Sequence, residues 1–102
     1  MGMPSPYVKF KERYPELTEN FEKLGVQCQQ SGPLDGRARR LVKLGMAIAT
    51  ASRGGVKSQV RKALGDGFSK EEIRHAAVLA LPTIGFPTMI AAIGWMEEVF
   101  AE

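Results

Sequence analysis

The feature that most constrains this chain is the stretch 34–64, which predicts two helices joined by a glycine-containing hinge. Before the hinge, apolar residues are dense enough for burial on more than one side of a helix: Leu41, Val42, Leu44, Met46, Ala47, Ile48 and Ala49. After it, a narrower stripe follows the helical period: Val56, Val60, Ala63 and Leu64. We place the hinge at residues 52–55, Ser-Arg-Gly-Gly, and expect the side chains that flank it to face a common crevice.

The N-terminal third predicts a loose end followed by two helices. Residues 1–4 have no apolar pattern, so we expect no fixed structure there. A short helix should end at Arg13, and a second should follow Pro15 and end near Gln29, with Gly32 in the left-handed conformation beyond it. On the second helix, four residues follow the helical period: Leu17, Phe21, Leu24 and Cys28.

Capping signals predict where the remaining helices begin. Asp35 suits the N-cap of the helix before the hinge, which should reach Ala51 or the next residue. Ser69 begins a capping-box pattern, so a helix should start there and extend to Leu81, and a short connector should lead to a last helix at Pro87. Because no alternating strand pattern occurs, the fold class is predicted to be all-α, a bundle of about six helices.

At 102 residues the chain is predicted to be one domain, 1–102, in which residues 1–14 form an N-terminal extension. A domain of this size has little room for an internal cavity, so we expect a useful pocket to need a second subunit. Residues 76–81 and the last helix also carry more apolar surface than a small monomer would bury. The sequence therefore predicts a homo-oligomer.

Several classes of partner and location are disfavoured. No apolar run is long enough to span a membrane and the N-terminus has no signal-peptide core, so a cytoplasmic protein is expected. The net charge is +3, but the basic residues are spread without exposed aromatics between them, so no nucleic-acid partner is predicted. The single cysteine, Cys28, excludes an intramolecular disulfide and a multi-cysteine metal site. We interpret it as a buried thiol and predict no metal or cofactor.

The order of motifs along the chain resembles the carboxymuconolactone decarboxylase family, which includes the alkylhydroperoxidase D-like proteins. The motifs are Leu34-Asp35-x-x-x-Arg39-x-Leu41, Val60-Arg61-x-Ala63-Leu64, a Gly-x-Gly followed by Glu71-Glu72-Ile73, and Gly85-Phe86-Pro87 before an alanine-rich helix. The resemblance covers roughly residues 15–102. It implies an all-helical, alkylhydroperoxidase D-like subunit that assembles into trimers or hexamers, with the pocket near subunit contacts.

The residues that carry chemistry in that family are not retained here. The redox branch has Cys-x-x-Cys-x-x-x-His, preceded by a glutamate twelve residues before the first cysteine. On this chain the cysteines align with Ser52 and Gly55, the histidine with Gln59 and the glutamate with Arg40. Glycine has no thiol and a glutamine amide does not act as a base, so the disulfide-based peroxidase reaction should be absent. The acid and histidine that resemble the proton-transfer groups of the decarboxylase branch are missing as well.

Candidate site residues have competing interpretations. Arg40, Gln59 and Ser52 form one hypothesis, a small pocket that binds an anion instead of moving protons, because a desolvated guanidinium favours carboxylate or phosphate. The alternative is a solvated or intersubunit arginine. Glycines 54 and 55 suit either an anion-binding nest or a simple tight turn.

His75 is the only histidine, and it is either a catalytic candidate or an interfacial or partly exposed side chain; as a lone histidine it is weak evidence for a metal. Phe86 is a pocket candidate, although a helix-entry role explains it as well.

Three functions remain open. The first is a family member with an altered site, a small-molecule pocket and altered or lost decarboxylase- or lactone-type activity. The second is a non-catalytic oligomeric scaffold or binding module. The third, disfavoured by the missing cysteine pair, is an alkylhydroperoxidase-type antioxidant activity.

Overall fold

A computed structural model describes residues 5–102, and the expectation for residues 1–4 lies outside this range. The described residues contain seven helical segments and no strand, so the predicted all-α class is confirmed. Six of the segments have eight or more residues, and the seventh is a single turn. By their internal contacts the residues form two compact units, here called unit 1, which ends at Pro33, and unit 2, Leu34–Glu102.

Unit 1 consists of α1 (Pro6–Arg13) and α2 (Pro15–Gln29), which pack against each other. The Ser5 hydroxyl accepts a hydrogen bond from the Val8 N–H at 3.2 Å and caps α1. Helix α2 ends in ordinary right-handed geometry at Gln30. The prediction that Gly32 is left-handed is wrong, since it is not among the positive-φ glycines.

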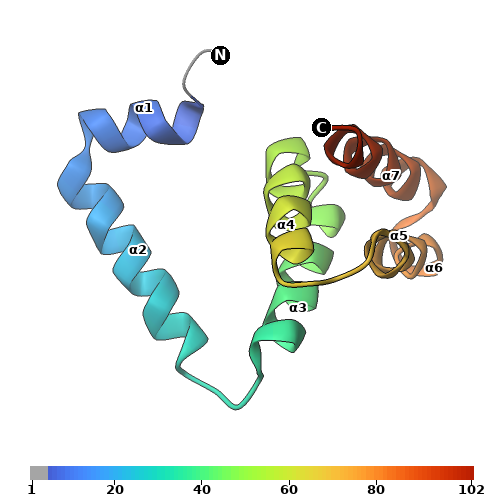
Figure 1. Cartoon of the computed structure of the whole chain (residues 1–102), viewed down its shortest axis with the longest axis horizontal. Helices are drawn as coiled ribbons and strands as arrows, with labels where there is room; N and C mark the ends of the chain where they lie inside the picture. The colour runs from blue at the N-terminus through green and yellow to red at the C-terminus, as the bar shows by residue number, and fades with distance from the viewer. Residues whose placement is uncertain (1–4) are drawn as a thin grey trace. The chain divides into compact units, whose positions relative to one another are not determined.

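Unit 2 contains α3 (Gly36–Ala49), α4 (Arg53–Gly65), α5 (Lys70–Val78), α6 (Leu81–Ile84) and α7 (Phe86–Phe100) (Figure 1). Helix α4 packs on α3 and α7, and α5 packs on α7 and α3. The core draws its largest fully buried apolar side chains from four of these helices: Leu44, Ile48, Val56, Val60, Ile73 and Met96. Burial of these side chains in one cluster is the main stabilising term for unit 2.

The apolar patterns of α3 and α4 differ in how well they predict which side chains are buried. On α4 the predicted narrow stripe is buried, since Val56, Val60 and Ala63 are all fully inaccessible. On α3 only one face is buried, and Leu41, Val42 and Met46 are 40–56% exposed. The expectation that α3 is buried on more than one side is therefore wrong for the described chain.

The turn between α3 and α4 lies earlier than the sequence predicts. Helix α3 ends at Ala49, Ala51 takes a left-handed φ of 52°, and Ser52 is the N-cap of α4. The predicted break at glycines 54 and 55 is wrong, because both glycines lie in the first turn of α4. The Gly55 N–H donates to the Ser52 hydroxyl at 3.0 Å, so neither the nest nor the tight-turn interpretation describes this pair.

For the helix after α4, the predicted start is confirmed and the predicted end is wrong. The capping box at the start of α5 is present, with the Ser69 hydroxyl accepting from the Glu72 N–H and the Glu72 carboxylate accepting from the Ser69 N–H. Helix α5 ends at Val78 instead of the predicted Leu81, and the predicted connector is largely the single turn α6. Gly85, with a φ of 91°, then permits the change of direction into α7.

Ion pairs cover the surface of unit 2 where α4, α5 and α7 meet. Arg74 binds both Glu97 and Glu71, and Glu98 accepts from Arg53 and Lys57. These pairs are largely exposed, so each contributes little to stability by itself. None of the described helices has the length and apolar character that a membrane crossing requires.

Candidate functional site

Two of the predicted site residues face each other across α3 and α4. Arg40 donates from Nη1 to the Gln59 Oε1 at 2.8 Å and from Nε to the Asp66 Oδ2 at 2.7 Å. Only 20% of the Arg40 side chain is exposed. Asp66 is the C-cap residue of α4, and nothing in the local sequence marks it as a partner of a residue on the preceding helix. The three side chains form one hydrogen-bonded group.

In this group, two of the five N–H donors of the Arg40 guanidinium are occupied. Its positive charge is neutralised by a carboxylate, and one further donor is occupied by an amide oxygen. A guanidinium and an amide neither take up nor release protons near neutral pH. Arg40 and Gln59 therefore hold α3 against the end of α4 and supply no acid or base themselves.

Ser52 lies apart from this group. It caps α4, and Gln59 is seven residues further along the same helix, a rise of about 10 Å at 1.5 Å per residue. Its hydroxyl accepts from the Gly55 N–H, and a Cβ added at Gly55 would lie 2.7 Å from the same oxygen. The structure thus brings Arg40 and Gln59 together and keeps Ser52 away from them.

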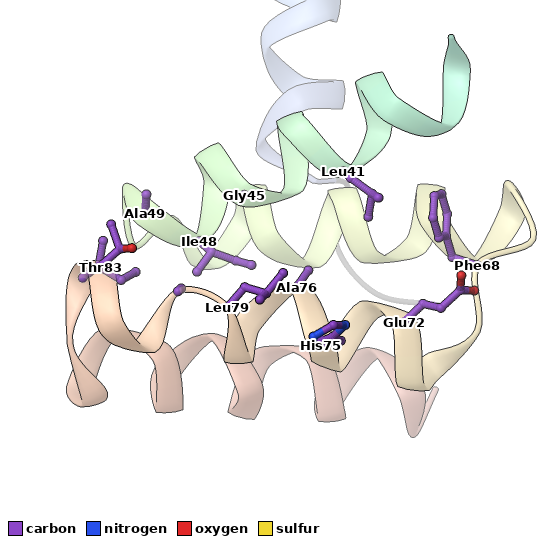
Figure 2. A pocket seen from close by; sticks show the side chains of 12 residues that line it. Leu41, Gly45, Ile48, Ala49, Phe68, Glu72, His75, Ala76, Leu79 and Thr83 are labelled. Carbon is purple, nitrogen blue, oxygen red and sulfur yellow. The ribbon is translucent and has the colours of Figure 1, made fainter. Parts of the chain in front are cut away.

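A groove lies on the other side of α3, where that helix meets α5 and α6 (Figure 2). Its volume is about 460 Å³, which falls in the range of small-molecule pockets. Most of its lining is apolar or small, and the full set is Leu41, Gly45, Ile48, Ala49, Phe68, Glu72, His75, Ala76, Leu79, Ala80, Thr83 and Ile84. None of Arg40, Ser52, Gln59 and Phe86 is in this set, and Phe86 is 57% exposed at the start of α7.

Three polar side chains line the groove, and two of them are on α5. Figure 2 places Glu72 and His75 on α5, near Phe68 and opposite Leu41, while Thr83 lies toward the other end. Glu72 is already engaged, since it accepts from the Ser69 N–H at 2.9 Å and from Arg37 at 3.3 Å. The Ser69 hydrogen bond, with a smaller contribution from the Arg37 charge, lowers the pKa of Glu72.

His75 differs from Glu72 in having no such partner. Within residues 5–102 its ring takes part in no hydrogen bond or ion pair, and the residue is exposed. An imidazole can donate or accept a hydrogen bond and can carry a proton near neutral pH. Among the groove residues, His75 is therefore the side chain best suited to bind the polar group of a ligand.

Comparison with known proteins decides the family. The model of the carboxymuconolactone decarboxylase family matches residues 15–98, most of the chain. The chain belongs to this family. It is also similar to an uncharacterized protein of Methanocaldococcus jannaschii, with 27% identity over 90 residues that cover 87% of this chain and 86% of that protein.

The resemblance assigns the two cysteines of the family's dithiol motif to Ser52 and Gly55 at the start of α4. Ser52 and Gly55 form the capped start of α4, and the one cysteine of the chain, Cys28, lies in unit 1. Cys28 is exposed, so its interpretation as a buried thiol is wrong. With one cysteine the chain has no Cys-x-x-Cys pair. Arg40 and Gln59, to which the resemblance assigns the family glutamate and histidine, are hydrogen-bonded to each other.

In the described part of the chain, no three or more His, Cys, Asp or Glu side chains form a group that suits a metal ion.

The groove was not foreseen from the sequence, because its walls come from segments about 30 residues apart whose facing sides depend on tertiary packing. The one local signal was His75, which the sequence singled out as the only histidine.

Proposed function

We propose that this carboxymuconolactone decarboxylase family member binds a small, mostly apolar molecule in the groove between α3, α5 and α6. The observation that carries the proposal is the groove itself, about 460 Å³ in volume, lined on α5 by His75, which makes no hydrogen bond or ion pair within residues 5–102. Apolar walls supply binding energy by removing ligand surface from water, at about 25 cal/mol per Å². A single polar side chain fixes the orientation of the ligand.

The chemistry of the ligand follows from the charges around His75. Arg37 and Glu72 form an ion pair with each other at 3.3 Å, so this end of the groove has no unbalanced charge from them. A neutral hydrogen-bonding group such as a hydroxyl fits better than a fully charged one, because burying an unpaired charge is costly. The proposed ligand class is a small ring or short chain with one hydroxyl or carbonyl.

Decarboxylase- or lactone-type activity is altered or lost in this proposal. The resemblance assigns the family acid and histidine to Arg40 and Gln59, which are hydrogen-bonded to each other and neither of which takes up or releases a proton near neutral pH. Any proton transfer on a ligand in the groove would instead involve His75. An anionic ligand at Arg40 remains a separate hypothesis, and such a ligand would have to compete with the Asp66 carboxylate.

Thermal unfolding with three probes tests the groove. Toluene, phenol and benzoate share a ring and differ in their polar group, and ligands that bind only the folded state raise the melting temperature. We expect phenol to stabilise more than toluene, and benzoate least. Gly45→Phe should abolish the effect, because Gly45 lines the groove and a Cβ there meets no atom within 4 Å. Gly45→Ala is the matched control and should keep most of it.

His75→Ala separates orientation from apolar binding. It should remove the advantage of phenol over toluene and leave the toluene shift unchanged. If millimolar probes leave the melting temperature of the native chain unchanged, or if Gly45→Phe retains the shifts, the groove is not the site. A benzoate effect that is lost in Arg40→Ala and retained in Gly45→Phe would favour the anion hypothesis instead.

A non-catalytic oligomeric scaffold is the second candidate, and a specific surface favours it. No charged residue occurs between His75 and Glu97, yet several large apolar side chains in this stretch are 39–63% exposed: Val78, Leu79, Leu81, Phe86 and Ile90. Surfaces that are apolar and free of charge are typical of contacts between identical subunits. We propose that this surface joins subunits, and Phe86→Glu should lower the mass measured by light scattering.

Peroxidase activity is the least supported alternative. Turnover requires a thiolate and a resolving thiol at the start of α4, where this chain has Ser52 and Gly55. We expect no consumption of a hydroperoxide in the presence of a dithiol reductant. Turnover that disappears in Cys28→Ser would contradict this.

A further inference from the structure

Unit 1 has almost no core of its own. Among its described residues only Thr18 is buried, and its hydroxyl donates to the Tyr14 carbonyl at 2.8 Å. Isolated helices shorter than about 12–15 residues are marginal in water, and chains below about 40 residues rarely fold without a further partner. Helices α1 and α2, with 8 and 15 residues, therefore need another surface to stabilise them.

That surface must cover an apolar face that the structure leaves open. Leu17, Phe21 and Leu24 lie on one side of α2 and are 58%, 67% and 54% exposed. Together with Tyr7 and Phe10 of α1 they border a concavity of about 550 Å³ within unit 1. With roughly 200 Å² for each large apolar side chain, these five residues expose about 500 Å². This is more than half of the roughly 800 Å² that one partner contributes to a stable interface.

The charges on α2 indicate which surface fits it. Helix α2 has Glu16, Glu19 and Glu22 against Lys23, a net charge of −3 + 1 = −2. Helix α3 has four basic residues and no acidic one; Arg37 and Arg40 pair with Glu72 and Asp66, so Arg39 and Lys43 leave a charge of +2 beside the exposed Leu41, Val42 and Met46. An acidic rim does not suit an anionic membrane surface, which attracts basic amphipathic helices. A basic helix with an exposed apolar face, such as α3, complements α2 in both charge and hydrophobicity.

We propose that α2 of one copy lies on the exposed face of α3 in a second copy, so that unit 1 is an arm exchanged between subunits. Exchange of an identical element is a low-cost route to an assembly, because the same contacts are made from each copy. The proposed receiving face of α3 shares only Leu41 with the groove between α3, α5 and α6, and substitutions on α2 leave the groove lining unchanged, so the arm and the proposed ligand site can fail independently.

The first test combines light scattering with a double variant. Leu17→Glu with Phe21→Glu places charges on the proposed interface, and Val26→Glu is the control, because it lies five residues from Phe21 and thus on the other side of the helix. We expect the native chain and the control to give a multiple of 11.2 kDa and the double variant to give a smaller mass. Fluorescence of Trp95 in unit 2 should stay the same in all three proteins and report that this unit remains folded.

Cys28 provides a second readout because it follows Phe21 by seven residues and lies on the same side of α2. Its reaction with a maleimide should be slowed by about tenfold or more in the assembled native chain and restored in the double variant or on dilution. A monomeric native chain would overturn the proposal. The proposal would also be overturned if Cys28 were protected and its rate of reaction with the maleimide did not depend on protein concentration. Residues of the same chain would then cover the face.

Cross-linking identifies the receiving helix. In a Met46→Cys variant, a short bis-maleimide should join Cys28 to position 46 of another chain, giving a product of twice the chain mass. Lys62→Cys, an exposed position on α4, is the control and should give little product that contains position 62. A link from Cys28 to position 46 within one chain would overturn the exchange.

Discussion

Arg40 is a residue whose contacts stabilise the packing of two helices. Its guanidinium binds Asp66 and Gln59 at once, and both contacts join α3 to α4 or to its C-cap. In a decarboxylase family member this is the position that the resemblance assigns to an acid. The same location therefore now contributes to the stability of unit 2.

Removing this side chain should be costly. Arg40→Ala removes two hydrogen bonds and leaves the half-buried Gln59 oxygen without its donor, so we expect the free energy of unfolding to fall by about 2 kcal/mol. Arg39→Ala is the control, because Arg39 donates to the Leu34 carbonyl and makes no ion pair within residues 5–102; its loss should be under about 1 kcal/mol. Urea unfolding measures both, and equal losses would show that the Arg40 group has no special role.

Residues whose role is local were predictable, and residues whose role depends on distant partners were not. Asp35 and Ser69 cap their helices as the sequence indicates, because a cap involves only the next three residues. Asp66 was missed because its partner is 26 positions away. Cys28 was misjudged because a helical apolar stripe indicates an amphipathic helix without showing what covers it.

At the level of elements, the start of α4 distinguishes its two glycines. A Cβ at Gly54 would meet no atom within 4 Å, whereas one at Gly55 would lie 2.7 Å from the Ser52 hydroxyl and 3.1 Å from its Cβ. Alanine favours a helix over glycine by about 0.5–1 kcal/mol, but loss of an N-cap costs about 1 kcal/mol. Gly54→Ala should therefore raise the stability, and Gly55→Ala should be about 1 kcal/mol less stable than Gly54→Ala.

Thermal unfolding checks this pair directly. For a domain of this size, 1 kcal/mol corresponds to a difference of about 4–8 °C in melting temperature. If the two alanine variants melt together, the Ser52 cap does not constrain this turn in solution.

The glycine pair also explains why the hinge was placed wrongly. Adjacent glycines commonly mark turns, yet here Ser52 accepts from the Gly55 N–H and keeps both glycines inside the helix. The reversal falls instead on Ala51, whose left-handed φ of 52° is not signalled by its residue type. Element types were thus readable from the periodicity, and element ends were not.

At the scale of the whole molecule, the carboxylates of unit 2 predict an acid-sensitive fold. Hydrogen bonds from Arg74 and from Arg61 lower the pKa of Glu97 and of Glu102, and Lys57 with Arg53 lowers the pKa of Glu98. A pKa that is lower in the folded than in the unfolded state stabilises the fold above the unfolded pKa. That contribution is lost as the pH falls through the folded pKa.

The melting temperature should therefore be level near neutrality and begin to fall near pH 4.5, where free glutamates take up protons. Glu97→Gln should make the decline shallower, because it removes one of the shifted groups. Glu12→Gln, at an exposed residue without an ion pair in the described part of the chain, should leave the curve unchanged. A decline of equal slope in all three proteins would assign the acid sensitivity to other groups.

The all-α class and family of the molecule could be predicted from the sequence, and its groove could not. The class follows from helical periods and caps, which are local, and the family from the order of motifs such as Gly85-Phe86-Pro87. The groove exists because α5 and α6 stand against one face of α3, leaving Gly45 and His75 on facing walls. The trimer or hexamer, the single domain and the anion site at Arg40 stay predictions.

The Arg40–Asp66 pair also limits which residues position 40 can accept. Arg40→Glu alone would set two carboxylates face to face where a 2.7 Å ion pair now lies, and like charges at that range repel. A glutamate at position 40 would therefore be tolerated only together with a change at Asp66, so these two positions, 26 residues apart, are epistatically coupled.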